Sequence, residues 1–500
     1  MSKFNPSKTY HPAGILFCGL LIAQILATIQ VYLSNTDLYT TVSAVNAAGY
    51  LAVPNEKVMG SLQNFWPAFW GGLFFTCSIG AGICLGSMAA AWIWIRFFSR
   101  NKFVLFVFLS IWGGTLLIVN TQGLALFPTL YFLMITPVLF MLTAKGVTPA
   151  DIQSTRRRRW INLIPIPILA LLWFTQFDNE TFLDLRDNLL LSNYFGKKFS
   201  NFYYSYTLYP AEAFKSLDQK LIRTCRLENI QNRSLKLKLI NRLLANDYLP
   251  LTDPARVDLI IIQKADRLIF RHNGRRIFQV KVNQFLSDSK KPLQRYAEEI
   301  DRNGAFRQLT YLSLWFGFPV LIYFILHAVL FYLAVIFLDQ KTAALTASIM
   351  CLLMGLIVLV YFQSNRSSNI EIKNVSEALQ SEKLSTRLAA LKTIRQKKLE
   401  IAEFREYPLL LKSRHPQERY WFVRIMALSR RPRTFNDLLK FINDENTNVR
   451  SMAFYSLGQR KNRRAVRPII EKINSSDDWY AQMYAYQALR SLGWKQTKLP

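Results

Sequence analysis

FVLFVFLSIWGGTLLIV, residues 103–119, contains no charged side chain. A helix needs about 20 mostly apolar residues to cross the hydrocarbon of a bilayer, because it rises about 1.5 Å per residue. Other stretches share this character, and the three acidic residues before position 176 lie outside all of them. The sequence therefore predicts a polytopic α-helical membrane protein with seven candidate spans: 13–33, 65–95, 103–119, 124–143, 160–177, 309–338 and 342–362.

The first candidate span has one alternative interpretation. Lys3 and Lys8 precede an apolar stretch, as they would in a secretory signal. The stretch includes Gln24 and Gln30, however, and no small-residue cleavage site follows closely. We therefore expect a retained membrane anchor.

Charged residues gather in two blocks, which divide the chain into four expected domains. Residues 1–177 form a membrane domain of about five spans, and 178–308 form an inserted soluble domain. A two-span hairpin, 309–362, then leads to a C-terminal domain, 363–500. This last block carries 27 Lys and Arg against 13 Asp and Glu, so it is strongly basic.

Lysine and arginine in short loops predict the orientation, because such loops stay in the cytoplasm. Arg96, Arg100 and Lys102 follow the second span, and the run 156–159 is four arginines before the fifth. With these loops cytoplasmic, both soluble domains lie on the extracytoplasmic side, in a bacterial inner membrane. The alternative places both in the cytoplasm, if Pro165 and Pro167 make 160–177 dip into the membrane without crossing it.

A stripe of small residues recurs every four positions in the second span: Ser78, Gly82, Gly86 and Ala90. Small side chains at this spacing let two helix backbones approach closely. The stripe predicts a helix-packing face, either against the chain's own helices or in an oligomer.

Chemistry-bearing residues are scarce in the spans. Their cores contain no Asp, Glu, Lys or Arg, which disfavours a transporter or channel. His327 is the one intramembrane histidine, and only His11 offers a partner for haem ligation, so a hydrogen bond within the bundle is the favoured interpretation. The sequence contains no P-loop, dinucleotide, nucleophile-elbow or zinc motif, and we expect no catalytic residue, metal or cofactor. An embedded enzyme of unknown chemistry stays open.

The inserted domain changes from helical to strand periodicity along its length. Residues 211–226 and 235–245 have helical spacing, and 266–271 and 275–282 flank Asn273-Gly274, a hairpin signal. The domain is predicted to be α+β. A winged helix is the alternative, with arginines at 267, 271, 275 and 276 on the wing, but nucleic acid is not expected on an outer face. An aromatic cluster at 199–209 belongs to the core or contacts lipid headgroups.

The last domain contains an internal repeat. Equivalent positions on one helical face recur at steps of 32, 31 and 35 residues. The four sets are Arg387, Ala390, Ile394; Arg419, Phe422, Met426; Arg450, Ala453, Leu457; and Ala485, Ala488, Leu492. Within it, DENTNVRSMAFYSLG (444–458) and SDDWYAQMYAYQALRSLG (476–493) resemble the second helices of short HEAT repeats of the phycobilisome-lyase-like type. The resemblance covers 376–494 and implies a C-terminal α-solenoid that binds other macromolecules.

Basic residues follow the second helices about one repeat apart. They are Arg430, Arg431, Arg433, Arg463 and Arg464, and we interpret them as a partner-binding edge for an acidic protein or for anionic membrane lipids. A merely solvated basic surface is the alternative. The function predicted from the sequence is a membrane-anchored scaffold or assembly factor that binds another membrane or envelope component.

Overall fold

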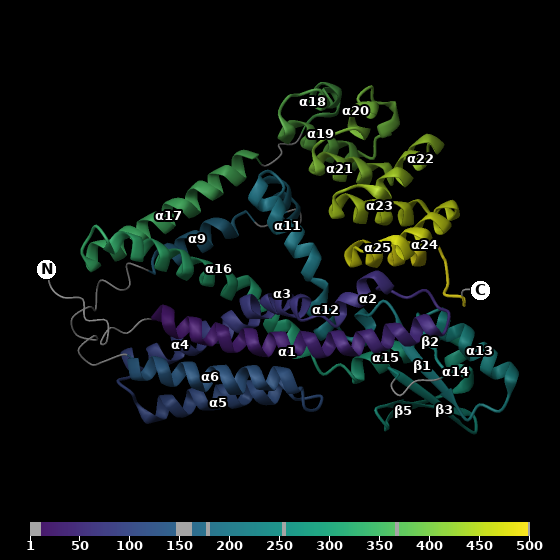
Figure 1. The fold of residues 1–500 in the computed structure, drawn as a ribbon, viewed down its shortest axis with the longest axis horizontal. Coiled ribbons are helices and arrows are strands. Elements are labelled where there is room, and N and C mark those ends of the chain that lie inside the picture. Colours follow the sequence, from purple (N-terminus) through teal and green to yellow (C-terminus); the bar gives the residue numbers. More distant parts are fainter. Residues whose placement is uncertain (1–11, 147–162, 177–180, 253–256, 366–369, 499–500) are drawn as a thin grey trace. The chain divides into compact units, whose positions relative to one another are not determined.

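The computed structural model describes residues 12–146, 163–176, 181–252, 257–365 and 370–498, and it divides into two compact units (Figure 1). The first, which we call the apolar unit, comprises Met1–Leu33, Phe65–Thr181 and Asp301–Tyr361. The second, the mixed unit, comprises Ser34–Asn64, Phe182–Ile300 and Phe362–Pro500. The domain boundaries at 177, 308 and 362 stay predictions.

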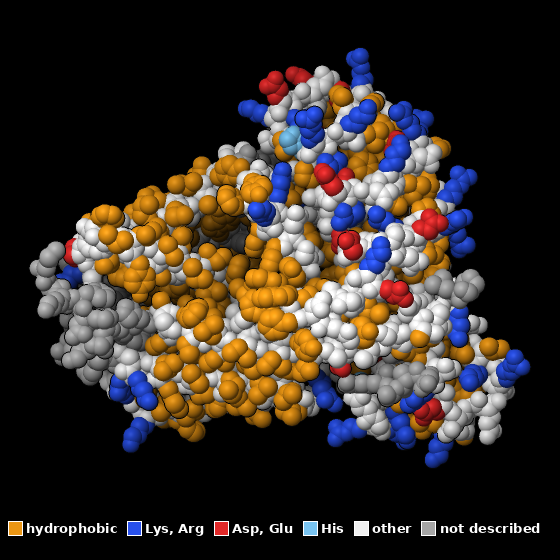
Figure 2. Space-filling view, in the orientation of Figure 1, with side chains coloured by type: hydrophobic (Ala, Val, Ile, Leu, Met, Phe, Trp, Pro, Cys, Tyr) orange, Lys and Arg blue, Asp and Glu red, His pale blue; other side chains and the backbone are white. Residues whose placement is uncertain are grey.

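Helices make up the apolar unit. They are α1 (Pro12–Ala47, of which residues up to Leu33 belong here), α3 (Phe65–Phe75), the π-helical turn η1 (Thr76–Gly80), α4 (Ala81–Arg96), α5 (Lys102–Val119), α6 (Leu126–Gly146), α9 (Pro165–Phe174), α16 (Gly304–Val335) and α17 (Gln340–Asn365). Six helices are long and apolar enough to cross a membrane: Pro12–Ala47, Phe65–Arg96, Lys102–Val119, Leu126–Gly146, Gly304–Val335 and Gln340–Ser364. Apolar side chains cover most of the face of this unit that Figure 2 shows.

The fifth predicted span, 160–177, differs from the other six. Its described part is α9, a helix of ten residues, which is about 15 Å long and half the thickness of a hydrocarbon core. Pro165 begins the helix, where its missing N–H costs no hydrogen bond, so the prolines start α9 and do not break it. A Cβ on Gly355 would lie 2.6 Å from Leu169, which shows that α9 packs closely on α17. The arginine run 156–159 lies outside the described residues.

A polar network joins α1 to the second apolar segment. Gln24 Nε2 donates to the carbonyl oxygen of Phe69 at 2.9 Å, and Thr76 Oγ1 donates to Gln24 Oε1 at 2.7 Å. A Cβ on Gly72 would lie 3.1 Å from the backbone nitrogen of Thr28, so the two helices touch backbone to backbone. The network satisfies the amide of Gln24 inside an otherwise apolar interface.

The segment that follows the first candidate span, from residue 34 onward, is largely helical. Helix α1 continues to Ala47, and α2 (Glu56–Leu62) follows. Val42, Val45 and Tyr50 share a buried cluster with Leu249 and Leu251 of the inserted domain. Helix α1 has 36 residues and is about 54 Å long at a rise of about 1.5 Å per residue. Its last 14 residues belong to the mixed unit.

The inserted domain is α+β, as predicted. Its sheet has the order β2-β1-β3-β4-β5, with β1 (Arg223–Glu228) parallel to both β2 (Tyr248–Pro250) and β3 (Leu259–Lys264). The antiparallel hairpin of β4 (Arg267–His272) and β5 (Arg275–Lys281) confirms the Asn273-Gly274 signal, and both turn residues have positive φ. The helices of this domain are α10 (Thr181–Leu185), the π-helical turn η2 (Arg186–Leu190), α11 (Tyr194–Tyr206), α12 (Leu208–Phe214), η3 (Leu217–Gln219), α13 (Arg233–Leu244), α14 (Val282–Ser287) and α15 (Lys290–Glu299).

The helix predicted over 211–226 is right only for 211–214, which belong to α12. Residues 223–228 are strand β1, which lies between β2 and β3. Parallel partners 20 or more residues away impose the extended backbone here, and local periodicity does not contain that information. A parallel β1–β3 pair that places β1 inside the sheet also excludes the winged-helix alternative.

The C-terminal part consists of four helix pairs. They are α18 (Val375–Leu379) with α19 (Leu384–Lys397), α20 (Tyr407–Leu411) with α21 (Pro416–Met426), α22 (Pro432–Lys440) with α23 (Thr447–Arg460), and α24 (Val466–Ser475) with α25 (Trp479–Ser491). Short 3₁₀ turns lie at Ile372–Asn374, Ile401–Glu403, Phe441–Asn443 and Arg463–Ala465. The apolar residues of the predicted repeat are buried in one continuous core, which confirms the repeat.

Asn55 attaches the segment before α2 to the end of the repeats. Its side-chain Nδ2 donates to the carbonyl oxygens of Ile473 at 2.7 Å and Ser476 at 2.8 Å, and its backbone N–H donates to Gln482 Oε1 at 2.9 Å. Gln496 accepts from and donates to the backbone of Leu51 in the same way. Asn55, which is more than 400 positions away in the sequence, thus caps the C-terminal end of α24.

Replacing Asn55 with alanine should therefore destabilise the mixed unit. The substitution leaves the buried carbonyls of Ile473 and Ser476 without this donor, which costs about 1–3 kcal/mol. Asn46→Ala is the matched control, because the Asn46 amide contacts Glu56 on an exposed surface. Thermal unfolding of the full chain in detergent checks both; equal melting temperatures for the two variants would contradict the attachment.

Candidate interaction surfaces

A ladder of arginines joins consecutive repeats. Arg387 Nε lies 2.7 Å from Glu418 Oε1, Arg419 Nε lies 2.7 Å from Asp444 Oδ2, and Arg450 pairs with Asp478. Each arginine also donates to the backbone carbonyl six residues before it. In the last repeat Gln482 takes this place: its Nε2 donates to the carbonyl oxygen of Ser476, six residues before it, but it carries no charge. The repeating arginine of the sequence is therefore a structural link between repeats.

The protein itself occupies the face that the second helices present. Trp421 Nε1 donates to Asp187 Oδ2 at 2.8 Å, and Gln417 Nε2 donates to the backbone oxygen of Asp187 at 3.2 Å. The Arg186 guanidinium lies 3.7 Å from the centre of the Tyr420 ring and pairs with Asp187. These contacts bury every residue of α21 except Arg424.

Further along the same face, aromatic rings make the contact. The ring of Tyr204 lies 4.7 Å from that of Tyr480, and the ring of Tyr209 lies 5.1 Å from that of Trp479. Burial raises the pKa of Tyr204 and of Tyr480, so both hydroxyls stay protonated at neutral pH. Helix α25 then contacts the inserted domain, where Tyr486 donates to Asp247 Oδ1 at 2.7 Å. The face from α21 to α25 is thus covered by residues 186–209 and 247.

The predicted partner-binding arginines lie on another edge of the repeats. Arg430 and Arg431 precede α22, Arg433 lies in it, and Arg463 and Arg464 lie in the 3₁₀ turn before α24; all five are exposed. Arg460 Nη2 donates to the backbone oxygen of Arg431 at 3.0 Å, so the two turns are neighbours. We call these five residues the basic edge. Figure 2 shows Lys and Arg side chains along the side of the repeats that carries α22 and α24.

Acidic neighbours engage only part of the basic edge. Arg431 pairs with Glu403 at 3.1 Å on exposed surface, and the exposed Arg433 lies 3.9 Å from the buried Asp437. Within the described ranges, no ion pair involves Arg463 or Arg464. These two guanidinium groups therefore face solvent with their charge uncompensated.

Part of the C-terminal sequence matches a known repeat family. Residues 407–490 match the HEAT repeats. The match covers the last three helix pairs of the structure, and the first pair, α18–α19, shares their arrangement and the arginine link through Arg387. No curated protein and no solved structure matches the chain. HEAT repeats commonly mediate protein–protein interaction or act as scaffolds, and the apolar helices are consistent with a membrane protein.

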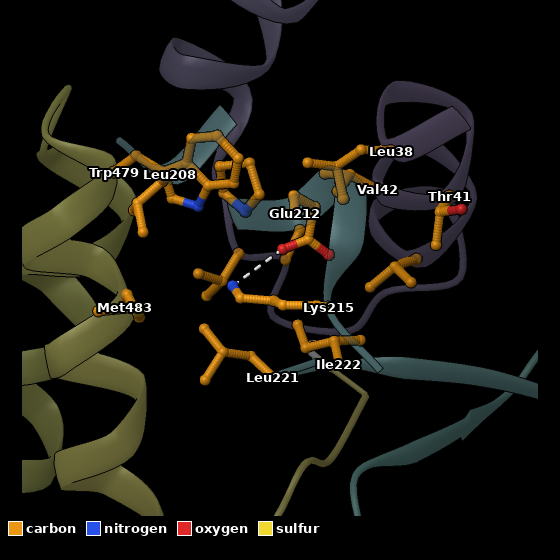
Figure 3. A pocket seen from close by; sticks show the side chains of 14 residues that line it. Leu38, Thr41, Val42, Leu208, Glu212, Lys215, Leu221, Ile222, Trp479 and Met483 are labelled. Atoms are coloured by element: carbon orange, nitrogen blue, oxygen red, sulfur yellow. Dashed lines mark hydrogen bonds and ion pairs between the residues drawn. The ribbon is translucent and has the colours of Figure 1, made fainter. Parts of the chain in front are cut away.

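A small cavity lies inside the mixed unit (Figure 3). It is lined by the end of α1, by α12 and by α25, and it contains an ion pair of 3.0 Å between Glu212 and Lys215. Its volume of about 30 Å³ suits one or two waters and excludes a substrate-sized ligand. Among the described residues, no group of three or more His, Cys, Asp or Glu side chains is arranged to hold a metal ion.

The small-residue stripe of α4 divides between two environments. Ser78 is buried, Ala90 is partly buried, and a Cβ on Gly317 of α16 would lie 3.1 Å from the Cα of Gly82, so α4 and α16 cross there. Gly86 is exposed, with nothing within 4 Å of the Cβ that it lacks. Gly82 thus lies in an interface of the chain's own helices, while Gly86 faces outward.

His327 pairs with a neighbouring helix. Its Nε2 lies 3.1 Å from Ser348 Oγ of α17, which is the hydrogen bond within the bundle that the sequence favoured. His11, the candidate second haem ligand, lies outside the described residues.

The sequence reasoning missed the residues that cover the repeats. Tyr204 belongs to the aromatic cluster 199–209, for which the sequence offered core packing, but Asn55, Asp187 and Asp247 are ordinary polar residues in linkers and short helical turns. No motif or periodicity marks them, because their partners are hundreds of positions away.

Gly82→Leu should disrupt the apolar unit, whereas Gly86→Leu should be tolerated. A side chain at Gly82 overlaps Ser313, and overpacking of this kind costs about 1–3 kcal/mol. Gly86 has open space for the same change. Thermal stability and accumulation of the two variants in detergent provide the measurement, and a loss confined to Gly86→Leu would contradict the α4–α16 contact or reveal an external partner at Gly86.

Proposed function

We propose that this protein is a membrane-anchored scaffold or assembly factor whose HEAT repeats bind another membrane or envelope component through the basic edge. The observation that carries the proposal is the occupied second-helix face. Repeat proteins usually bind partners on one extended face of the stack, but here residues 186–209 cover that face. The basic edge is the exposed, repeat-spaced surface that the chain leaves available.

The chemistry of the edge favours an acidic protein. Five arginines in two adjacent turns provide planar groups that bind carboxylates in a bidentate manner. Among the described residues, neither Arg463 nor Arg464 forms an ion pair. A carboxylate of the partner therefore displaces water from these guanidinium groups and does not have to break an internal ion pair. Anionic lipid headgroups are the alternative ligand and become one outcome of the test.

The test reverses the charge of four edge residues: Arg430, Arg431, Arg463 and Arg464 to Glu. The matched control reverses four exposed basic residues of the inserted domain: Lys236, Lys238, Arg267 and Arg275 to Glu. Both variants change the net charge by the same amount, and both use the full chain, because Leu51 and Val53 belong to the core of the repeats.

The edge variant should lose its co-purifying protein, while the control keeps it. Because each exposed ion pair contributes about 0.2–1 kcal/mol, we expect binding to weaken by about tenfold or more. Binding by the unmodified chain should also weaken as salt rises. Quantitative mass spectrometry after mild detergent extraction is the measurement. Equal retention by both variants, or loss of lipid alone, would overturn the proposal of a protein partner.

We also propose that the mixed unit is extracytoplasmic. Residues 34–64, 182–300 and 362–500 pack in one compact unit, and soluble segments that pack together lie on one side of a membrane. Three long apolar helices lie between segments 34–64 and 182–300, and three crossings would place these segments on opposite sides of the membrane. A fourth crossing, in the region of α9, is therefore needed to bring both to the same side. The positive loop of Arg96, Arg100 and Lys102 then supports the cytoplasmic assignment of the opposite side.

Reporters fused after Asn303 and after Pro500 test this topology. Both should give the extracytoplasmic signal of a paired phosphatase and fluorescent-protein assay, because an even number of crossings separates them. A cytoplasmic signal from both would contradict the fourth crossing and favour a region of α9 that dips into the membrane.

A further inference from the structure

Helix α11 has an exposed aromatic face that the scaffold role does not use. Phe195, Phe199, Phe202 and Tyr206 follow the spacing i, i+4, i+7 and i+11, which places them on one side of the helix. Phe195 is 81% exposed and Phe199 is 55% exposed, whereas Phe202 and Tyr206 are partly buried, with their ring centres 5.0 Å apart. Exposed aromatic residues in a contiguous row are uncommon on a monomeric surface and mark an interaction site. Figure 2 shows apolar side chains gathered over α11.

The opposite side of α11 is fixed to the repeats. Ser200 is buried, and Tyr204 packs edge-to-face on Tyr480 of α25. Gly196 lies so close to the backbone of Leu190 that a Cβ there would not fit. The helix is therefore held rigidly with its aromatic face outward, and its exposure does not result from a loose segment.

Charge and chain position identify the occupant. Helix α11 carries Lys197 and Lys198 and no acidic residue, so it suits an anionic surface. It begins 20 residues after the end of α9, an apolar helix that packs on α17. Phe and Tyr with flanking Lys are the composition of helices that lie in the headgroup layer of a bilayer. A soluble acidic protein would match the lysines but would leave the phenylalanine rings without an apolar medium.

We propose that α11 is an in-plane membrane anchor, which buries the rings of Phe195 and Phe199 at the boundary of the acyl chains while Lys198 contacts lipid phosphates. The occupant is an anionic phospholipid bilayer. This contact orients the mixed unit on the membrane surface and is independent of the basic edge, since the two surfaces share no residue.

The experiment places the photo-reactive amino acid benzoylphenylalanine at position 195 or 199 of the full chain, reconstituted in nanodiscs of phosphatidylglycerol and phosphatidylcholine. The control position is Leu409 of α20, which is 73% exposed on the repeats. After illumination, mass spectrometry of the peptides counts lipid adducts. We expect several-fold more adducts at 195 and 199 than at 409.

Lys198→Glu tests the electrostatic part. It should lower the adduct yield at 195 in discs that contain phosphatidylglycerol and leave the yield unchanged in phosphatidylcholine alone. Adducts at 195 and 199 no more frequent than at 409 would overturn the proposal. Cross-links at 195 to a second copy of the chain or to a co-purifying protein, without lipid adducts, would overturn it as well and assign the face to a protein interface.

Discussion

The mixed unit depends on the burial of Asp187 against the second helices of the repeats. A buried carboxylate is costly unless it is paired and hydrogen-bonded. Here Arg186 supplies the counter-charge and the Trp421 N–H supplies a second donor, so the group is compensated on both sides. Loss of Arg186 would leave an unpaired carboxylate in the core, and loss of Trp421 would remove one of the donors that Asp187 accepts from.

Two further contacts also attach other segments of the chain to the repeats. Asn55 caps the carbonyl end of α24, and Asp247 accepts from Tyr486 while it pairs with Arg490 at 3.1 Å. Together they join three parts of the chain that apolar helices separate in sequence. The repeats are consequently the centre around which the other segments assemble, while the basic edge stays exposed.

The helices of the apolar unit are joined mainly by uncharged groups, although Arg307 pairs with Asp301 at the start of α16. Its contacts are close backbone approaches at Gly72, Gly82 and Gly317, together with the amide and hydroxyl groups of Gln24 and Thr76. The π-helical turn Thr76–Gly80 lies where these approaches occur, and Thr76 in it reaches Gln24. Small residues and single polar groups thus join the helices of this unit, as ion pairs join the segments of the mixed unit.

The sequence by itself determined the elements whose cause is local. Long uncharged runs predicted the six long apolar helices, Asn273-Gly274 predicted the β4–β5 hairpin, and the spacing of Arg419, Phe422 and Met426 predicted the HEAT pattern. Each depends on residues within about one helix or one turn of each other, so periodicity and turn chemistry contain the information.

Tertiary structure decided what depends on distant partners. Strand β1 formed in place of a predicted helix because β2 and β3 pair with it in parallel. Helix α1 continues past the predicted end of the first span, and Val42 and Val45 of this extension are buried with Leu249 and Leu251. The covered face of the repeats depends in the same way on Asn55, Asp187 and Asp247. Such contacts arise from the packing of segments hundreds of residues apart. The local sequence around a polar residue does not indicate which distant residue will be its partner.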